Sequence, residues 1–309
     1  MDYPLKPVDR VEVTVLVDNY TDNSVPSMTP VDRRPPFDPG RQILAEHGFS
    51  CLIRTFVGTK EHRILLDAGL SRECMAWNSR QLGISLSAIE AVVLSHGHFD
   101  HTGGLPGLFS GAGQPLPLIV HPDAFLRRRL NGLAGGPVEL PQLDATALKK
   151  AGADLQVRAG PSTLATGHLL VTGEVERTTS FEKGMPGMEA FADGRWQVDP
   201  IRDDQALVIS VKDRGLVVLS GCAHAGIVNT VEYARKITGI DHVRAVLGGF
   251  HLTGPALKPV ILPTIDAMSR IDPDYVVPMH CTGWDAINRF MEAMPGKCIL
   301  NTVGTTYVF

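Results

Sequence analysis

Four potential metal ligands lie within six residues in the stretch His96-Gly97-His98-Phe99-Asp100-His101. Imidazole and carboxylate groups bind Zn²⁺ well and also suit Fe and Mn. The stretch directly follows residues 89–94, an almost continuous apolar run that is typical of a strand buried on both faces. A turn leaving such a strand can direct His96 and His98 at one metal ion and Asp100 and His101 at a second. The sequence therefore predicts a centre of two divalent metal ions, with zinc preferred and manganese or iron as alternatives.

Further potential ligands follow strand-like runs in the second half of the chain. Cys222 ends one such run, and His224 lies two residues beyond it. Free cysteines are often simply small buried residues, but the neighbouring Gly221 and His224 favour a place at or near the metals. His251 follows a buried run and a Gly-Gly pair, and we expect it to face the substrate or to relay protons.

Strand-like and helix-like segments alternate in two halves, each of which begins with hairpin strands and continues with alternating helices and strands. Two mixed sheets packed face to face, with helices outside, would bury all of these strands, which makes the predicted fold an α/β sandwich of αββα type. No linker divides residues 1–309, so we expect a single domain. The predicted strands are 11–17, 49–57, 63–66, 89–94, 116–120, 154–157, 169–172, 206–211, 216–219, 243–247 and 275–277, and the predicted helices are 71–82, 227–237, 259–270 and 284–294.

Two long segments without periodicity, near residues 18–40 and 176–204, are predicted to be loop insertions that cover the site and set substrate choice. Arg33, Arg34 and Lys183 lie in them and are candidates for contact with an anionic group of the substrate. The densest basic run, residues 127–129, is interpreted as the solvated face of a helix.

The run His96-x-His98-x-Asp100-His101 resembles the signature of the metallo-β-lactamase superfamily. Asp67, in Ile-Leu-Leu-Asp-Ala-Gly, resembles the aspartate that ends an early strand in this family and supports the metal-binding loop. The resemblance implies the αββα fold and a metal-dependent hydrolase, with Asp67 fixing the tautomers of the histidine ligands.

Other family features follow in the expected order. Cys222 stands where the family usually places a bridging aspartate, and some members use cysteine there. His280 resembles the last histidine ligand before a helix. Residues 221–230 and 248–252 are similar to the dihydropterin (methanopterin-pathway) phosphate synthase-like branch of the superfamily.

One position departs from the family pattern. A Gly-His-Thr-type turn in mid-chain usually supplies a third histidine to the first metal, but the matching stretch here, residues 172–175, offers Glu174. His224 is the favoured substitute, Glu174 is the alternative, and a centre that uses neither stays open. The full set of expected ligands is His96, His98, Asp100, His101, Cys222, His224 and His280.

The function predicted from these residues is hydrolysis of an ester, lactone or phosphoester bond in a small organic substrate. Water bound to the metals would ionise near neutral pH and attack, with Asp100 and His251 as catalytic residues. A metal-dependent synthase or transferase acting on a pterin-like phosphorylated substrate is an alternative, and a diiron-type oxidoreductase is another.

Composition and charge limit the partners. The net charge is −4 and no long basic run occurs, which argues against nucleic acid as a partner. No apolar run reaches the roughly 18 residues needed to span a bilayer, no signal-peptide pattern is visible, and five scattered cysteines do not suggest a disulfide framework. We therefore expect a cytoplasmic protein with a small-molecule substrate and no membrane partner; a homodimer remains possible.

Overall fold

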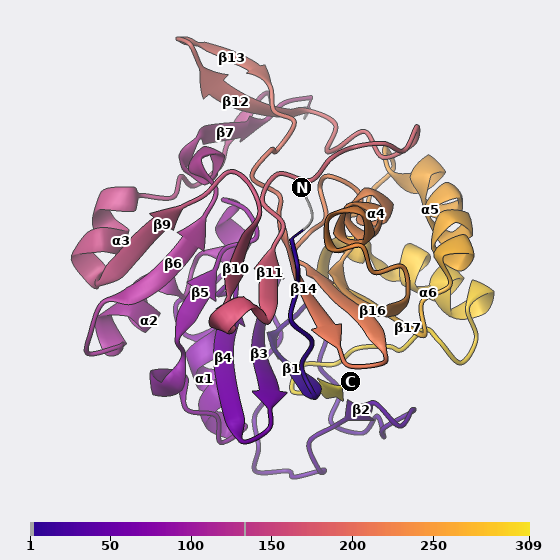
Figure 1. Cartoon of the computed structure of the whole chain (residues 1–309). Helices are drawn as coiled ribbons and strands as arrows, with labels where there is room; N and C mark the ends of the chain where they lie inside the picture. Colours follow the sequence, from indigo (N-terminus) through magenta and orange to yellow (C-terminus); the bar gives the residue numbers. More distant parts are fainter. Residues whose placement is uncertain (1–2, 133) are drawn as a thin grey trace.

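An eight-stranded mixed sheet forms one half of the fold (Figure 1). The computed structural model describes residues 3–132 and 134–309. β4, β5, β6 and β9 run parallel, whereas β1, β3 and β18 join them through antiparallel pairs. In sheet order the strands are β2 (Asp32–Arg33), β18 (Thr306–Val308), β1 (Arg10–Val17), β3 (Ser50–Val57), β4 (Lys60–Leu66), β5 (Ala91–Val93), β6 (Leu116–Val120) and β9 (Ala153–Val157).

A six-stranded sheet forms the other half and packs against the first. Its β14–β15 hairpin is followed by parallel pairing of β15, β16 and β17. Apolar side chains from both sheets form one continuous core, in which β-branched residues dominate. In sheet order the strands are β10 (Ser162–Leu164), β11 (Leu169–Val171), β14 (Ala206–Val211), β15 (Gly215–Ser220), β16 (Val243–Gly249) and β17 (Tyr275–Met279).

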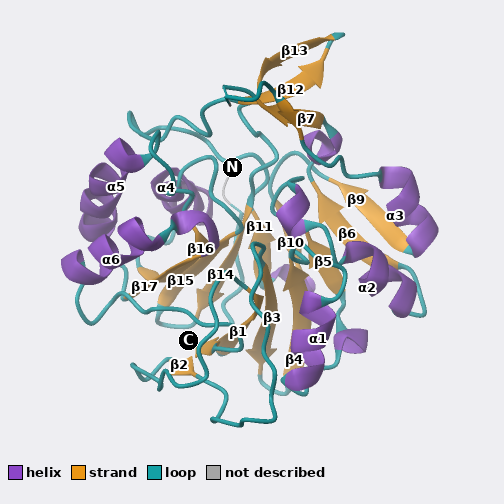
Figure 2. Ribbon diagram, turned by 180° about the vertical axis from the view of Figure 1, so that it is seen from behind, coloured by secondary structure: helices purple, strands orange, loops and turns teal. Residues whose placement is uncertain are grey.

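Helices cover the outer faces of both sheets, as Figure 2 shows. A second apolar cluster lies between the eight-stranded sheet and its helices, which are α1 (Cys74–Gln81), α2 (Leu105–Gly111) and α3 (Ala145–Ala151). A third lies between the six-stranded sheet and its helices, which are α4 (Ile227–Thr238), α5 (Lys258–Ile271) and α6 (Trp284–Ala293). This arrangement confirms the predicted αββα sandwich. None of the helices in residues 3–132 and 134–309 has the length and apolar content needed to cross a bilayer.

A small third sheet projects from one end of the sandwich and corrects two predictions. The segment 176–204, expected to be an irregular loop, contains the hairpin of β12 (Met188–Ala192) and β13 (Arg195–Val198). β12 pairs with β7 (Arg127–Leu130), and β7 pairs on its other side with β8 (Val138–Glu139). Residues 127–129 are therefore a strand and not a solvated helix face. Alternation along the strand turns Arg128 inward, where its side chain is only 2% exposed.

Candidate metal centre

The carboxyl ends of parallel strands from both sheets meet at one edge of the sandwich, and the candidate residues follow these ends directly. Asp67 follows β4, Cys222 and His224 follow β15, His251 follows β16 and His280 follows β17. The histidine run 96–101 follows β5 in the same way. Because parallel strands bring their carboxyl ends to a common edge, residues more than 180 positions apart become neighbours.

The backbone is strained at these strand ends. Asp67, Ala223, His251 and His280 have φ angles of 58°, 54°, 44° and 52°, a left-handed conformation that is uncommon for residues other than glycine. Such conformations persist only where the surrounding structure fixes them, and they cluster at functional sites. Four of them at one edge mark this edge as the candidate site.

Three ring nitrogens converge at the first part of the site. His96 Nε2 lies 3.0 Å from His98 Nδ1, and His224 Nε2 lies 3.2 Å from His96 Nε2 and 3.1 Å from His98 Nδ1. We call these residues the His96 group. All three are buried, and burial lowers the pKa of His96 and His224 well below the usual value and that of His98 to about 3. Three neutral rings therefore aim lone pairs at one point.

A second set combines a carboxylate with two imidazoles. Asp100 Oδ2 lies 3.4 Å from His280 Nε2 and 3.8 Å from His101 Nε2, and we call these three residues the Asp100 group. Although burial alone would raise it, the pKa of Asp100 is held well below its usual value by His101 and His280. Burial would lower the pKa of His101, but the carboxylates of Asp67 and Asp100 outweigh it and raise that pKa to about 9.

Cys222 lies between the two groups. Its Sγ is 3.2 Å from His101 Nε2, and it shares ligand distance both with His96 and with His224 and His251. The thiol is buried, which raises its pKa in the absence of a cation. A cation would favour the thiolate, as coordinating thiols lose their proton to a metal.

The comparisons with known proteins agree with this geometry. The sequence profile described as "Metallo-beta-lactamase superfamily" matches residues 50–235. A synthase of Methanocaldococcus jannaschii, named 7,8-dihydropterin-6-methyl-4-(beta-D-ribofuranosyl)-aminobenzene-5'-phosphate synthase, is 32% identical over 92% of both chains. An uncharacterized protein of the same organism is 32% identical over 84% of this chain and 95% of its own length.

The chain belongs to the metallo-β-lactamase superfamily. A solved structure described as a metal-dependent hydrolase of the β-lactamase superfamily superposes with a TM-score of 0.75 at 23% identity, over 96% of this chain and 98% of the other. It shows that the two chains share a fold.

The donor atoms of this superfamily member suit divalent cations. Nitrogens that each lie about 2.0–2.1 Å from one zinc ion in tetrahedral geometry are about 3.3 Å apart, close to the 3.0–3.2 Å spacing of the His96 group. His280 Nε2 is buried without a hydrogen-bond partner among the described residues, and it faces Asp100. Three converging nitrogens and an unsatisfied buried nitrogen beside a carboxylate are what a cation would satisfy.

Residues behind the ligands fix their orientation. Asp67 Oδ2 accepts a 2.6 Å hydrogen bond from His101 Nδ1, which leaves Nε2 directed into the site, and Asp67 Oδ1 accepts from the Ser95 backbone. Asn19 Oδ1 lies 3.1 Å from His280 Nδ1 and orients that ring in the same way. A Cβ at Gly221 would collide with Ser95 Oγ and Asp67 Oδ2, so close packing of the strand ends requires glycine there.

A buried ionic network supports the turn that carries His96 and His98. Arg128 Nε donates to Asp199 Oδ2 at 2.6 Å, and Arg128 Nη1 donates to Asp203 Oδ2 at 3.1 Å. Asp203 Oδ2 in turn accepts a 2.7 Å hydrogen bond from the Gly97 backbone. The 176–204 segment thus reaches the metal-binding turn through Asp203.

His224 and Glu174, the two residues expected to complete the set of His96 and His98, lie in different surroundings. His224 joins His96 and His98, whereas Glu174 is exposed and lies 3.9 Å from Arg202. Lys183 lines a small cavity together with His224 and His251. Arg33 and Arg34 line a cavity that none of the expected ligands borders, so contact of these two arginines with a substrate at the metals is wrong.

Three residues at the site escaped the sequence analysis. His47, a lone histidine outside the motifs of the sequence, lies 3.5 Å from Asp100 Oδ2 with its side chain 60% exposed. Cys281, one of the five scattered cysteines, has its Sγ within ligand distance of Cys222 and His280. Asn19 lies in a segment without recognisable pattern. Nothing in the sequence around these three residues indicates a role, because their partners at the site are distant in sequence and become neighbours only in the folded chain.

Proposed function

We propose that this protein is a metal-dependent hydrolase that cleaves an ester, lactone or phosphoester bond of a small organic substrate. The observation that carries the proposal is the convergence of His96, His98 and His224 at 3.0–3.2 Å, beside a second group containing Asp100. In this proposal the His96 group holds one cation, the Asp100 group holds the other, and Cys222 lies between them.

Two divalent cations in such a site would polarise the scissile group and supply a nucleophile at neutral pH. The side chains of the protein would orient the reactants. Asp100, at the centre of its group, would orient the attacking species, and His47 at the exposed rim would bound the entrance.

The cavity beside the His96 group offers groups for the substrate and for the departing product. Lys183 is exposed at its edge, and the ring of His251 packs against that of His224 with centroids 4.3 Å apart and planes inclined by 56°. We assign to the Lys183 ammonium the contact with an anionic group of the substrate. His251 would give a proton to the leaving oxygen, since its pKa is raised by Cys281 despite the opposing effect of burial.

A second candidate function is a synthase reaction on a phosphorylated, pterin-like substrate. The observation that favours it is the 32% identity, over 92% of both chains, to a protein named as a dihydropterin-(ribofuranosyl)aminobenzene phosphate synthase. The same two ligand groups and Lys183 would serve that reaction, because cations that polarise a scissile ester can equally polarise a phosphate group of the substrate.

The test is an assay of purified protein reconstituted separately with zinc, manganese and iron. Chromogenic phosphomonoesters, phosphodiesters and lactones are the hydrolytic substrates, and formation of a phosphorylated dihydropterin conjugate is the synthase readout. The proposal expects metal-dependent turnover of at least one hydrolytic substrate, abolished by a chelator and restored by the metal.

His98→Ala serves as the inactive control, and Glu174→Ala serves as a matched variant outside the site that should retain turnover. Conjugate formation without hydrolysis would establish the second candidate. Turnover that survives both the chelator and His98→Ala would contradict both candidates.

A further inference from the structure

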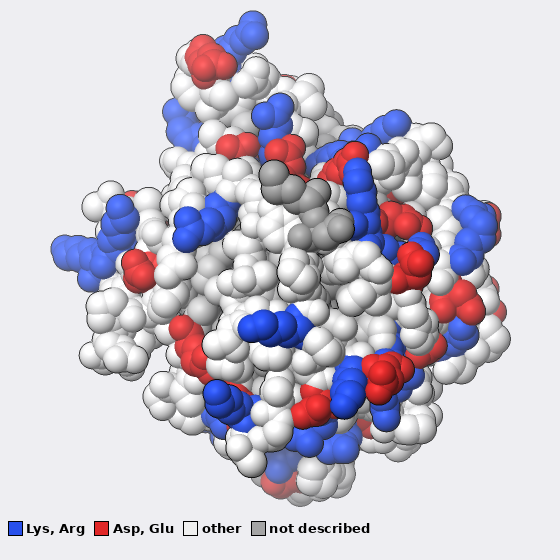
Figure 3. All heavy atoms as spheres, viewed as in Figure 1, with Lys and Arg blue, Asp and Glu red and all other residues white. Residues whose placement is uncertain are grey.

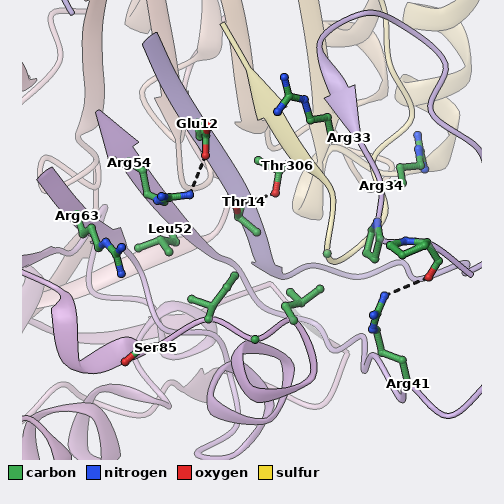
Figure 4. A pocket seen from close by; sticks show the side chains of 16 residues that line it. Glu12, Thr14, Arg33, Arg34, Arg41, Leu52, Arg54, Arg63, Ser85 and Thr306 are labelled. Atoms are coloured by element: carbon green, nitrogen blue, oxygen red, sulfur yellow. Dashed lines mark hydrogen bonds and ion pairs between the residues drawn. The ribbon is translucent and has the colours of Figure 1, made fainter. Parts of the chain in front are cut away.

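A cavity of about 590 Å³ lies on the outer face of the eight-stranded sheet (Figure 4). Its floor is formed by residues of β2, β18, β1, β3 and β4, and its walls come from residues 34–41 and from residues 82–85. None of the expected metal ligands borders it. The cavity is therefore separate from the metal centre.

The cavity is lined by five arginines and a single acidic residue, Glu12. This is unusual in a chain whose net charge is −4. On the face drawn in Figure 3, basic and acidic side chains are instead interspersed. A concave surface lined by one sign of charge concentrates ligands of the opposite sign.

Two of the arginines, Arg54 and Arg63, lie on the sheet, and the carboxylates near them do not pair with all of their N–H groups. Arg54 Nε and Arg63 Nε both bind Glu61 Oε1 at 2.7 Å, and Arg54 Nη1 binds Glu12 Oε2 at 2.8 Å. Arg63 Nη1 and Nη2 make no hydrogen bond or ion pair with the described residues. These donors are left for a ligand.

Two more arginines lie at the other end of the cavity, as Figure 4 shows: Arg33 is on the edge strand β2 of the same sheet, and Arg41 is in the segment that follows β2. Arg33 makes no side-chain hydrogen bond or ion pair with any residue in 3–132 or 134–309. Arg41 donates to the Pro36 carbonyl and lies 3.9 Å from Asp38. Arg34, the fifth, donates through Nε to Asp32 and through Nη2 to the Leu300 carbonyl. Donors on two sides of a cavity suit a ligand with more than one anionic group.

The apolar residues that line the cavity, together with its volume, indicate which class of ligand it could bind. Leu52, Leu82 and Ile84 give the cavity an apolar part. Its volume lies in the range of roughly 300–1,000 Å³ that is usual for small-molecule sites. Guanidinium groups bind phosphate oxygens in pairs. A molecule with two or more phosphates and one compact apolar group matches these features.

We propose that this arginine cavity binds a small polyphosphorylated molecule of the nucleoside diphosphate or triphosphate class, at a site distinct from the metal centre. The phosphates lie between Arg54 and Arg63, on β3 and β4, and Arg33 and Arg41, at the β2 end of the cavity. The base packs on the apolar part. The proposal is independent of the reaction at the metals.

The test is calorimetric titration of the metal-loaded protein with ADP, tripolyphosphate and adenosine at low salt. We expect ADP and tripolyphosphate to bind and adenosine not to bind. The double variant Arg33→Ala/Arg41→Ala should weaken this binding at least about tenfold, because each lost charge-assisted hydrogen bond costs about that factor or more. Arg195→Ala, on the exposed end of β13, is the matched control and should leave binding unchanged.

Phosphates also bind metal ions, so the two sites must be separated. Binding at the metal centre would survive the double variant, and the stoichiometry would then fall from two sites to one. Thermal unfolding of the double variant establishes that it is folded. The proposal is overturned if all binding survives the double variant, if Arg195→Ala weakens it equally, or if a single-stranded oligonucleotide binds while ADP does not.

Discussion

The two groups of candidate ligands differ in the charged residues that surround them. The His96 group has three neutral rings, no carboxylate among its members, and the buried cation Arg128 nearby, which contributes to lowering the pKa of all three rings after the larger effect of burial. The Asp100 group contains one carboxylate and has a second, Asp67, bound to His101 at 2.6 Å. The first set needs a cation to satisfy its lone pairs, whereas the second can form ion pairs without one.

This difference shows that neighbouring charges and burial can give the same types of side chain different protonation states and different affinities for a cation. Burial, with a smaller contribution from Arg128, keeps the nitrogens of the His96 group unprotonated and ready to bind. Negative charge behind the Asp100 group attracts a cation strongly but also attracts a proton. We therefore expect the two groups to respond differently to mutation and to pH.

The largest effect is expected where the His96 group is broken directly. His224→Ala should remove about one metal ion per chain and lower turnover by about a thousandfold or more, since metal catalysis contributes several kcal/mol and each 1.36 kcal/mol is a factor of ten. Elemental analysis and steady-state kinetics measure the two effects. Glu174→Ala is the matched control, because Glu174 is exposed and paired with Arg202. Loss of the ion in Glu174→Ala, with His224→Ala unaffected, would reverse the assignment.

The next effect concerns the network that supports the His96 group. Arg128→Ala leaves Asp199 and Asp203 buried without their partner, so the free energy of unfolding should fall by about 3–5 kcal/mol. Arg127→Ala breaks an exposed pair with Glu139 on the same strand and should cost only about 1 kcal/mol or less. Denaturant unfolding of both variants provides the measurement. Equal losses would show that burial of Arg128 contributes nothing.

The contrast between these two arginines also shows what the sequence could predict. Residues 127–129 carry the same charge, and only pairing with β12 turns Arg128 inward toward Asp199 and Asp203. These partners lie about 70 positions away in the sequence. The local pattern of residues 127–129 therefore predicted a helix where the structure has a strand. The missed strand β18 forms its pairs with β1 across nearly the whole chain.

Local signals were sufficient where the chemistry is local. The run 96–101 follows a buried strand and holds ligands of both groups, so composition and spacing predicted it. The strongly periodic or apolar segments, including β1, β14 and α4, lie where they were expected. His47, Asn19 and Cys281 were missed because each is a single residue whose role depends on neighbours that only the folded chain supplies.

A smaller effect is expected from the carboxylate behind the Asp100 group. Asp67→Asn keeps the shape but removes the charge that orients His101, and it should weaken binding of the metal in this group by about 10- to 100-fold. Competition with a chelator of known affinity measures the change. Asp144→Asn, at the N-cap of α3, is the matched control, since asparagine caps helices as well as aspartate. The comparison fails if Asp67→Asn weakens the ion of the His96 group more than that of the Asp100 group.

The smallest expected effect is a difference between the two groups in how their affinity for a cation depends on pH. His101 must release its proton to bind a cation, and its pKa in the metal-free protein is raised to about 9, where the carboxylates of Asp67 and Asp100 outweigh burial. Below that pH the apparent affinity of the Asp100 group should therefore fall by about tenfold per unit as the solution becomes more acidic. The imidazoles of the His96 group have lowered pKa values and release no proton when a cation binds above pH 6, so the slope for this group should be shallower than that for the Asp100 group. Zinc titrations of metal-free protein between pH 6 and 9 separate the two ions, and parallel slopes would show that the charges behind the ligands do not distinguish them.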